Sequence, residues 1–262
     1  AFGETDATTG EWKIKTSPSV SYGTQGWFWL KDSISTTDFS PNSNTFTVGG
    51  GTLTKTEDCP ANVFATWNPL IKQYSGDIVL ANGNTKLQNS NDWSSMFTTI
   101  GAETGKYYWE IKINDISATT LSFIGVVGGK YVSDGNRLLN DSTPYDYTDG
   151  MLLWQNGGQT IINDDSTNAG TYASYAAGDI LGFALDLTSA TKTIQFYKNG
   201  TIDSTGSINL PTNMQTDFVF PHAQVNNNIV FANFGNGYFG TTAITTNSGN
   251  GYAGAEGASK FN

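Results

Sequence analysis

Residues Gly178–Gly200, GDILGFALDLTSATKTIQFYKNG, show the clearest strand pattern in the chain. In its first half every second residue is large and apolar: Leu181, Phe183, Leu185 and Leu187. This period of two is typical of a β-strand with one heavily apolar face. The second half repeats the pattern with Ile194 and Phe196, and Asn199-Gly200 is a dipeptide that type I′ hairpin turns favour. The stretch therefore predicts two strands of an antiparallel β-sandwich.

Strand patterns continue on both sides of this hairpin. Segments with such a pattern are 77–81, 86–88, 93–100, 106–113, 122–127, 151–155, 160–163, 218–224 and 228–234. In 106–113, Trp109 and its alternating apolar neighbours share one face, and Glu110 lies on the other. The run 122–127 is apolar throughout, which predicts a strand covered on both faces. No long helical pattern is present, so the sequence predicts an all-β fold.

Four sections of different character divide the chain. We predict an N-terminal arm over 1–21, an aromatic strand and linker over 22–70, a β-sandwich over 71–240 and a flexible C-terminal segment over 241–262. Within the second section, strands are expected around Trp27–Leu30 and Phe46–Val48. The chain starts at Ala1 without Met, and we expect the polypeptide to continue at one end or both.

Composition limits the classes of partner. The formal net charge is −10, whereas binding to nucleic acid or to an anionic membrane needs clustered Lys and Arg. No apolar run approaches the ~18 residues that a membrane-spanning helix needs. Cys59 is the only cysteine, so the chain contains no internal disulfide. We therefore expect neither nucleic acid nor a membrane as a partner.

Four of the strand segments occur in an order that is typical of one family. They are GKYYWEIKI (105–113), FIGVV (123–127), the hairpin 178–200 and FVFPHAQVNNNIVFANFG (218–235). Together they resemble a SPRY domain, which is a concanavalin-like β-sandwich and a binding module. The resemblance implies an antiparallel concanavalin-like sandwich of SPRY type with an N-terminal extension, and a protein that is not an enzyme.

Three further segments narrow the resemblance. YGTQGWFWLKD (22–32), TEDCPANVFATWNPL (56–70) and FANFGNGYFG (231–240) resemble SPRY-containing structural proteins of tailed bacteriophages. That resemblance implies a place on the virion surface, in a tail fibre, a tail or a capsid decoration. It also implies contacts with other virion subunits and binding to a host-surface glycan or protein. The aromatic residues Trp27 and Trp29 indicate contact with a neighbouring copy, so we expect a homo-oligomer. The alternative is a purely structural assembly protein.

The segment 130–150 is the candidate contact surface, because it is too long for a hairpin turn and long loops are often functional. It contains Tyr131, Arg137, Tyr145 and Tyr147, residue types that anchor many recognition surfaces. SPRY domains generally bind partners through loops at one end of the sandwich, which agrees with this choice. The alternative is that these tyrosines cover the edge of the core.

Catalysis and metal binding find little support. His222 is the only histidine, and we interpret it as a strand residue at an edge or in a loop. A carbohydrate-active enzyme would need two facing carboxylates. The candidates are Glu103, Glu110, Asp164, Asp165 and Asp186.

Acidic loops could also hold Ca²⁺. The residues concerned are Asp141, Asp146, Asp149, Asp164 and Asp165, which we interpret as solvated. No motif predicts a cofactor, because the G-x-G-x-x-G at 235–240 precedes no helical pattern.

Overall fold

A computed structural model of the 262-residue chain provides the structure. It describes residues 3–5, 12–15, 18–28, 36–51, 64–70, 78–90, 93–116, 122–133, 150–157, 160–162, 172–203 and 205–244. The chain divides into two units, residues 1–64 and residues 65–261.

The N-terminal unit contains one short hairpin, in which β1 (Gly3–Thr5) pairs antiparallel with β2 (Trp12–Ile14). A second ordered feature is centred on Asp38, whose carboxylate accepts backbone N–H bonds from Phe28, Ser40 and Asn44. These bonds hold the turn at 38–44 against the chain near Phe28.

Two strands expected in this unit are absent from its described residues. Trp27, Phe28 and Phe46–Val48 lie outside any strand, and only an isolated bridge joins Thr37 to Thr45. The prediction was wrong for these residues because an apolar or aromatic run does not by itself provide a pairing partner. Trp29 and Leu30 lie outside the described residues.

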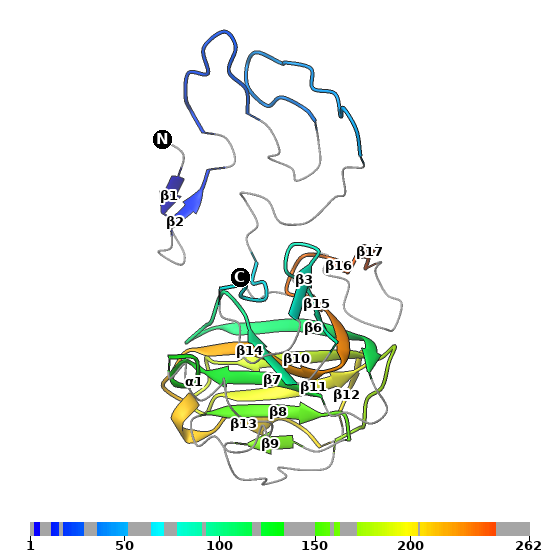
Figure 1. The fold of residues 1–262 in the computed structure, drawn as a ribbon. Helices are drawn as coiled ribbons and strands as arrows, with labels where there is room; N and C mark the ends of the chain where they lie inside the picture. The colour runs from blue at the N-terminus through cyan, green and yellow to red at the C-terminus, as the bar shows by residue number, and fades with distance from the viewer. Residues whose placement is uncertain are drawn as a thin grey trace. The chain divides into compact units, whose positions relative to one another are not determined.

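The second unit is a two-layer antiparallel β-sandwich (Figure 1). Its eight-stranded sheet has the order β12 (Thr201–Ile202), β11 (Thr193–Lys198), β10 (Ile180–Asp186), β6 (Lys106–Ile116), β15 (Asn228–Asn233), β4 (Lys86–Asn89) and β3 (Ile78–Ala81), and β13 (Ile208–Asn209) also pairs with β11. Its five-stranded sheet has the order β5 (Trp93–Phe97), β14 (Val219–Asn226), β7 (Phe123–Gly128), β8 (Met151–Gln155) and β9 (Thr160–Ile162). The all-β sandwich predicted from the sequence is confirmed.

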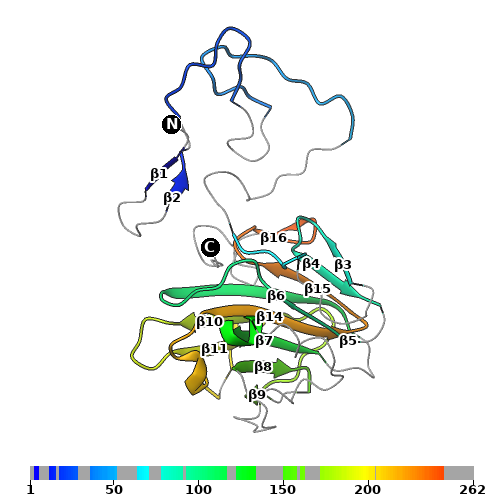
Figure 2. The same cartoon turned by 60° about the vertical axis from the view of Figure 1, so that its left-hand side comes forward.

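Three short elements complete the described part of this unit. They are a helix α1 (Gly129–Ser133), a 3₁₀ turn η1 (Thr212–Met214) and a hairpin of β16 (Tyr238–Phe239) with β17 (Thr242–Ala243). Helix α1 follows β7 directly and lies at one end of the sandwich, on the left in Figure 1, and the turned view brings this end toward the viewer (Figure 2). Among the described residues, no helix has the length and apolar character that crossing a bilayer requires.

Aromatic side chains from both sheets form the main core. Trp109, Phe183 and Phe196 stand in one register row across β6, β10 and β11, and all three are fully buried. Trp154 of the other sheet stacks on Phe196. Burying one large apolar side chain contributes about 1.5–3 kcal/mol, so this cluster is a main source of stability. The face predicted for Trp109 from the alternation in 106–113 is confirmed.

The five-stranded sheet is also apolar on its outer face. A second cluster there is formed by Phe97, Phe123, Val127, Tyr131 and Leu153, all of them buried. Every residue of β7 is buried, which confirms that this strand is covered on both faces.

The turn at the end of the 178–200 hairpin has the predicted form. Asn199 and Gly200 have φ angles of 51° and 76°, which is the left-handed conformation that a type I′ turn requires. The Asn199 side chain accepts the N–H of Ile180 at 2.8 Å and donates to Asp179 at 2.7 Å. The turn is therefore tied to the start of β10.

His222 occupies a different position from the one expected. It lies on β14, between β5 and β7, and its side chain is fully buried. The expectation of an edge or loop position was wrong, because the neighbouring strands that cover His222 come from segments far away in the sequence.

Candidate functional site

The structure places one of the four predicted contact residues. Tyr131 lies in α1 with 4% of its surface exposed, and its ring meets that of His222 at a centroid distance of 5.9 Å. This side chain packs in the interior, which is the alternative that the sequence left open for the tyrosines. Arg137, Tyr145 and Tyr147 lie outside the described residues, so their contact role stays a prediction.

Beside α1 is an open hollow of about 620 Å³, called here the loop-end hollow. Its wall includes Lys130 and Val132 from α1, and Asp217, Phe218 and Phe220 from the start of β14 and the segment before it. Phe218 is 51% exposed, although most phenylalanines in the described part of the sandwich are buried. An exposed aromatic ring in a concave surface is a common feature of recognition sites.

Backbone hydrogen bonds fix the geometry of this hollow. The Asp217 carboxylate accepts the N–H of Lys130 at 2.8 Å and that of Phe218 at 2.8 Å. The carbonyl of Phe218 accepts the N–H of Gly129 at 2.7 Å. Phe220 packs edge-on against Phe97 of the second cluster at 5.9 Å. The exposed Phe218 ring therefore belongs to a segment that is hydrogen-bonded to α1 and packed, through Phe220, against the second cluster.

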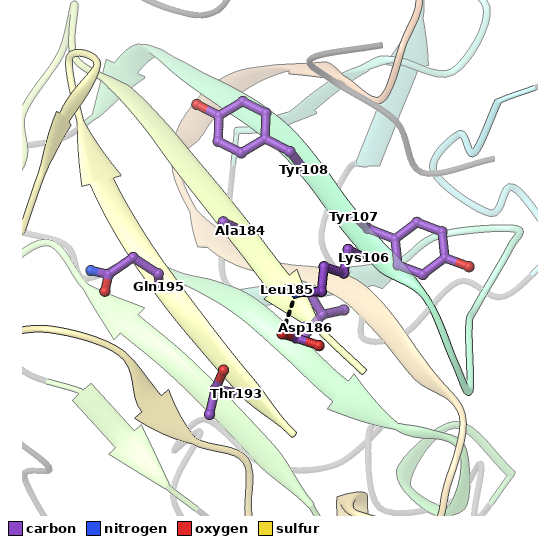
Figure 3. Close-up of a pocket in the computed structure, with 8 residues that line it drawn as sticks. All are labelled: Lys106, Tyr107, Tyr108, Ala184, Leu185, Asp186, Thr193 and Gln195. Carbon is purple, nitrogen blue, oxygen red and sulfur yellow. Dashed lines mark ion pairs between the residues drawn. The ribbon is translucent and has the colours of Figure 1, made fainter. Parts of the chain in front are cut away.

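A second concave surface lies on the outer face of the eight-stranded sheet, and we call it the tyrosine groove (Figure 3). Its volume is about 380 Å³. Its lining residues come from β6, β10 and β11: Lys106, Tyr107, Tyr108, Ala184, Leu185, Asp186, Thr193 and Gln195. Register explains the grouping, because Tyr108, Ala184 and Gln195 form one row across the three strands and Lys106, Asp186 and Thr193 form the next row on the same face.

Small residues on β10 create the space in this groove. Ala184 lies in the Tyr108 row, and Gly182 lies one row further along. A Cβ atom at Gly182 would come within 2.4 Å of the Tyr108 hydroxyl oxygen and 3.1 Å of the Tyr197 Cβ atom. The tip of the Tyr108 ring therefore lies over Gly182, and the ring meets that of Tyr197 at a centroid distance of 6.0 Å.

Polar contacts hold the two ends of the groove. The Tyr108 hydroxyl donates to Glu110 at 3.1 Å, and Lys106 forms an ion pair with Asp186 at 2.9 Å (Figure 3). The hydrogen bond from Lys106, together with backbone N–H donors at Thr188 and Ser189, keeps the pKa of Asp186 well below its usual value. Asp186 is therefore a carboxylate at neutral pH.

The carboxylates considered for catalysis have structural surroundings. Glu110 is fully buried on the outer side of its sheet, where it contacts the Tyr108 hydroxyl and the amide of Asn233. Asp186 accepts N–H bonds from the turn that follows it. Asp164 and Asp165 lie outside the described residues. These contacts give Glu110 and Asp186 a role in the sheet and its turns.

His222 lies next to a serine but is closed off from substrates. Its Nε2 atom is 2.5 Å from the Ser95 hydroxyl oxygen, and burial lowers its pKa to about 3. A nucleophile and base that act on a substrate must be reachable, whereas both side chains are buried, His222 completely. This pair is therefore part of the packed interior, where the His222 ring also contacts Tyr131 of the second cluster.

Metal sites are also absent from the part of the chain that the structure describes, since it contains no group of three or more His, Cys, Asp or Glu side chains suited to an ion. Asp141, Asp146 and Asp149 lie outside that part, as do Asp164 and Asp165. Our interpretation of these aspartates as solvated side chains, and not as Ca²⁺ ligands, stays a prediction.

Sequence reasoning missed both hollows. The signal for the tyrosine groove was present in β10, where Gly182 and Ala184 alternate with Leu181, Phe183 and Leu185. Two small residues on the face opposite the core indicate a strand surface that carries no large side chain of its own. Which side chains line that surface depends on the register of β6 and β11, and the alternation does not contain that information.

Comparison with known proteins places the chain in a family. The protein-family model of the SPRY domain matches residues 106–237, which is half of the chain. Among solved structures, the chain is similar to the SPRY domain of human HERC1, with 20% sequence identity, a TM-score of 0.48, and coverage of 63% of this chain and 96% of that one. No curated protein matches the chain. SPRY domains are typically non-catalytic modules that bind other proteins. This chain belongs to the SPRY-domain family.

Proposed function

We propose that this chain is a non-enzymatic surface protein of a tailed-phage virion, in a fibre, a tail or a capsid decoration. It binds a host-surface protein or glycan at the end of the sandwich where α1 lies. The observation that carries the proposal is the exposed Phe218 ring in the loop-end hollow, on a segment fixed by hydrogen bonds to α1.

The chemistry of the hollow suits a segment of protein. Phe218, Phe220 and Val132 offer apolar contact area, and Lys130 and Asp217 supply one charge of each sign at the rim. Binding energy in such surfaces concentrates in a few aromatic anchors surrounded by polar groups. In the sequence, α1 is followed directly by 134–149, the segment that contains Arg137, Tyr145 and Tyr147.

The virion location rests on the resemblance of 22–32, 56–70 and 231–240 to structural proteins of tailed phages. The net charge of −10 agrees with a protein that is exposed to solvent and does not contact packaged nucleic acid. Other virion subunits and further copies of this chain are the partners that this location implies.

A direct test compares two exposed apolar residues at different places on the sandwich. Phe218 is 51% exposed in the loop-end hollow, and Ile202 is 55% exposed on β12. Labelled full chain is added to a panel of bacterial isolates that the phage infects. We expect Phe218→Ser to weaken cell binding at least tenfold, about 1.4 kcal/mol, and Ile202→Ser to leave it unchanged. Equal binding by the two variants and the wild type would remove the hollow as the contact site.

A purely structural role in the virion is the second candidate. The observation in its favour is Trp27, which is 57% exposed in the N-terminal unit and lies beside Phe46 at a ring distance of 6.1 Å. An exposed aromatic side chain of this kind suits contact with another subunit. Retention of the chain in assembled particles would then depend on Trp27 and not on Phe218.

A further inference from the structure

We propose that the tyrosine groove is a second ligand site and that its ligand is a neutral sugar. The groove lies on the outer face of β6, β10 and β11, away from the loop-end hollow, and shares no lining residue with it.

The shape fits a small ring. Ala184 gives a low floor between the side chains of Tyr108 on one side and Gln195 on the other. The space of about 380 Å³ falls in the range of roughly 300–1,000 Å³ that small-molecule sites occupy. Larger side chains at Ala184 would fill this space without touching the core, because its row faces away from the core row of Trp109, Phe183 and Phe196.

Tyr108 supplies an aromatic wall with a fixed orientation. The contact of its tip with Gly182, its hydroxyl bond to Glu110 and its packing against Tyr197 hold the ring in place. The ring remains half-buried, so part of it faces the groove. The C–H groups on one face of a pyranose ring pack against an aromatic face in this way. A ring that is ordered in advance loses little entropy on binding.

The polar groups of the groove match the hydroxyl groups of a sugar. Thr193 has a hydroxyl group, which both donates and accepts, and Lys106 donates from an ammonium group that is 70% exposed. The Gln195 amide nitrogen is directed to the carbonyl of Phe196 at 3.1 Å, which leaves its oxygen as an acceptor. Sugar hydroxyl groups also donate and accept, so they can satisfy all three partners.

Charge selects a neutral ligand over an acidic one. Within the groove, the carboxylate of Asp186 is paired with the ammonium of Lys106 at 2.9 Å, so the two formal charges cancel. The whole chain carries a formal charge of −10, which disfavours the approach of an anion. A neutral sugar needs no unpaired positive charge in the groove and is not repelled by the net negative charge of the chain.

The test is a titration of the isotope-labelled full chain, followed by NMR. The probes are methyl glycosides of glucose, galactose, mannose and N-acetylglucosamine, with glucuronic acid as the charged comparison. We expect at least one neutral glycoside to cause saturable shifts at Tyr108, Ala184 and Gln195, with a Kd of about 1 mM, which corresponds to a small ligand in an open site.

Two variants and one matched control make the result specific. Ala184→Leu fills the floor and is expected to weaken binding at least tenfold, and Tyr108→Ala removes the aromatic wall with the same result. Tyr238→Ala truncates another half-buried tyrosine outside the groove and should leave binding unchanged. Thermal unfolding of each variant shows whether it is folded. If Tyr108→Ala fails to fold because Glu110 loses a partner, Ala184→Leu alone decides the matter.

The outcomes separate this site from the proposed function. No saturable shift in the groove at about 10 mM of any neutral glycoside overturns the proposal, as does a preference for glucuronic acid or shifts confined to the loop-end hollow. Because the titration uses no cells and no virion, its failure leaves the Phe218 experiment unaffected. Failure of the Phe218 experiment likewise leaves the groove open to test.

Discussion

Trp154 of β8 and Phe196 of β11 stack with their ring centroids 5.1 Å apart and their planes 10° from parallel. The two rings belong to different sheets, so this contact joins the layers of the sandwich. Phe183 meets both rings edge-on, at 5.5 Å from Phe196 and 6.4 Å from Trp154. These ring contacts therefore hold the two sheets together and give the binding surfaces on them a rigid support.

Truncating the centre of this cluster should destabilise the sandwich strongly. We expect Trp154→Ala to lower the free energy of unfolding by about 3–5 kcal/mol, because it removes the stacked ring, leaves a cavity and frees the carbonyl of Ala173. Chemical denaturation followed by circular dichroism measures the loss. Trp27→Ala is the control: this tryptophan is 57% exposed, and the change should stay within about 0.5 kcal/mol. Similar losses for the two variants would contradict the assignment of the core.

Gly125 of β7 is predicted to tolerate no side chain. A Cβ atom there would come within 2.1 Å of the carbonyl oxygen of Leu152, which belongs to the backbone of the paired strand β8. We expect Gly125→Ala to cost at least 1–3 kcal/mol, roughly the range for an overpacked interior, since a backbone atom cannot turn aside. Gly50→Ala provides the control, because no atom lies within 4 Å of its added Cβ. A stable Gly125→Ala protein would show that the pairing of β7 with β8 is different.

The hairpin turn gives a prediction about side chain and backbone together. Asn199→Ala loses the bonds to Ile180 and Asp179 and places alanine at a φ of 51°, so we expect a loss of about 2 kcal/mol. Asn199→Gly loses the same bonds but adopts this φ readily, so its loss should be smaller. Thermal unfolding of both variants makes the comparison. A larger loss for glycine than for alanine would be inconsistent with the left-handed turn.

His222 makes stability depend on pH. Burial lowers its pKa from 6.5 to about 3 in the folded protein, so the neutral ring is favoured by folding. The contribution is fully present above the unfolded pKa of 6.5 and is lost as the pH falls towards 3. We expect the free energy of unfolding to fall between pH 6.5 and pH 5 by roughly 1 kcal/mol per pH unit from this group.

Urea denaturation of the wild type and of His222→Gln at pH 7 and pH 5 isolates this effect, because both proteins contain the same carboxyl groups. The variant should show the smaller difference between the two pH values. An equal difference in the two proteins would mean that protons reach His222 in the folded state.

Sequence patterns were sufficient where the structure depends on neighbours along the chain. The alternation in 180–187 and the Asn199-Gly200 dipeptide specify a hairpin because strand faces and turn angles are local properties. The strand patterns at 151–155 and 160–163 are local for the same reason, and the structure pairs these segments as β8 and β9. Helix α1 was not, because its five residues are too few to show a helical period.

Properties that depend on distant segments could not be predicted. His222 is buried because β5 and β7 flank it, and its partner Ser95 is 127 residues away in the chain. The alternation placed Glu110 on the face opposite Trp109, but it did not show that Glu110 is buried there and lies close to Asn233, 123 residues away. The tyrosine groove likewise needs the register of three strands, and an alternation within one strand does not fix that register.

Cryo-electron microscopy of the phage particle to which we propose this chain belongs tests the virion-surface role. We predict that the chain is present at the particle surface with Phe218 and the loop-end hollow facing outward, free of contact with neighbouring virion subunits. A hollow buried against another subunit would make this an assembly protein, and absence of the chain from the particle would contradict the virion role altogether.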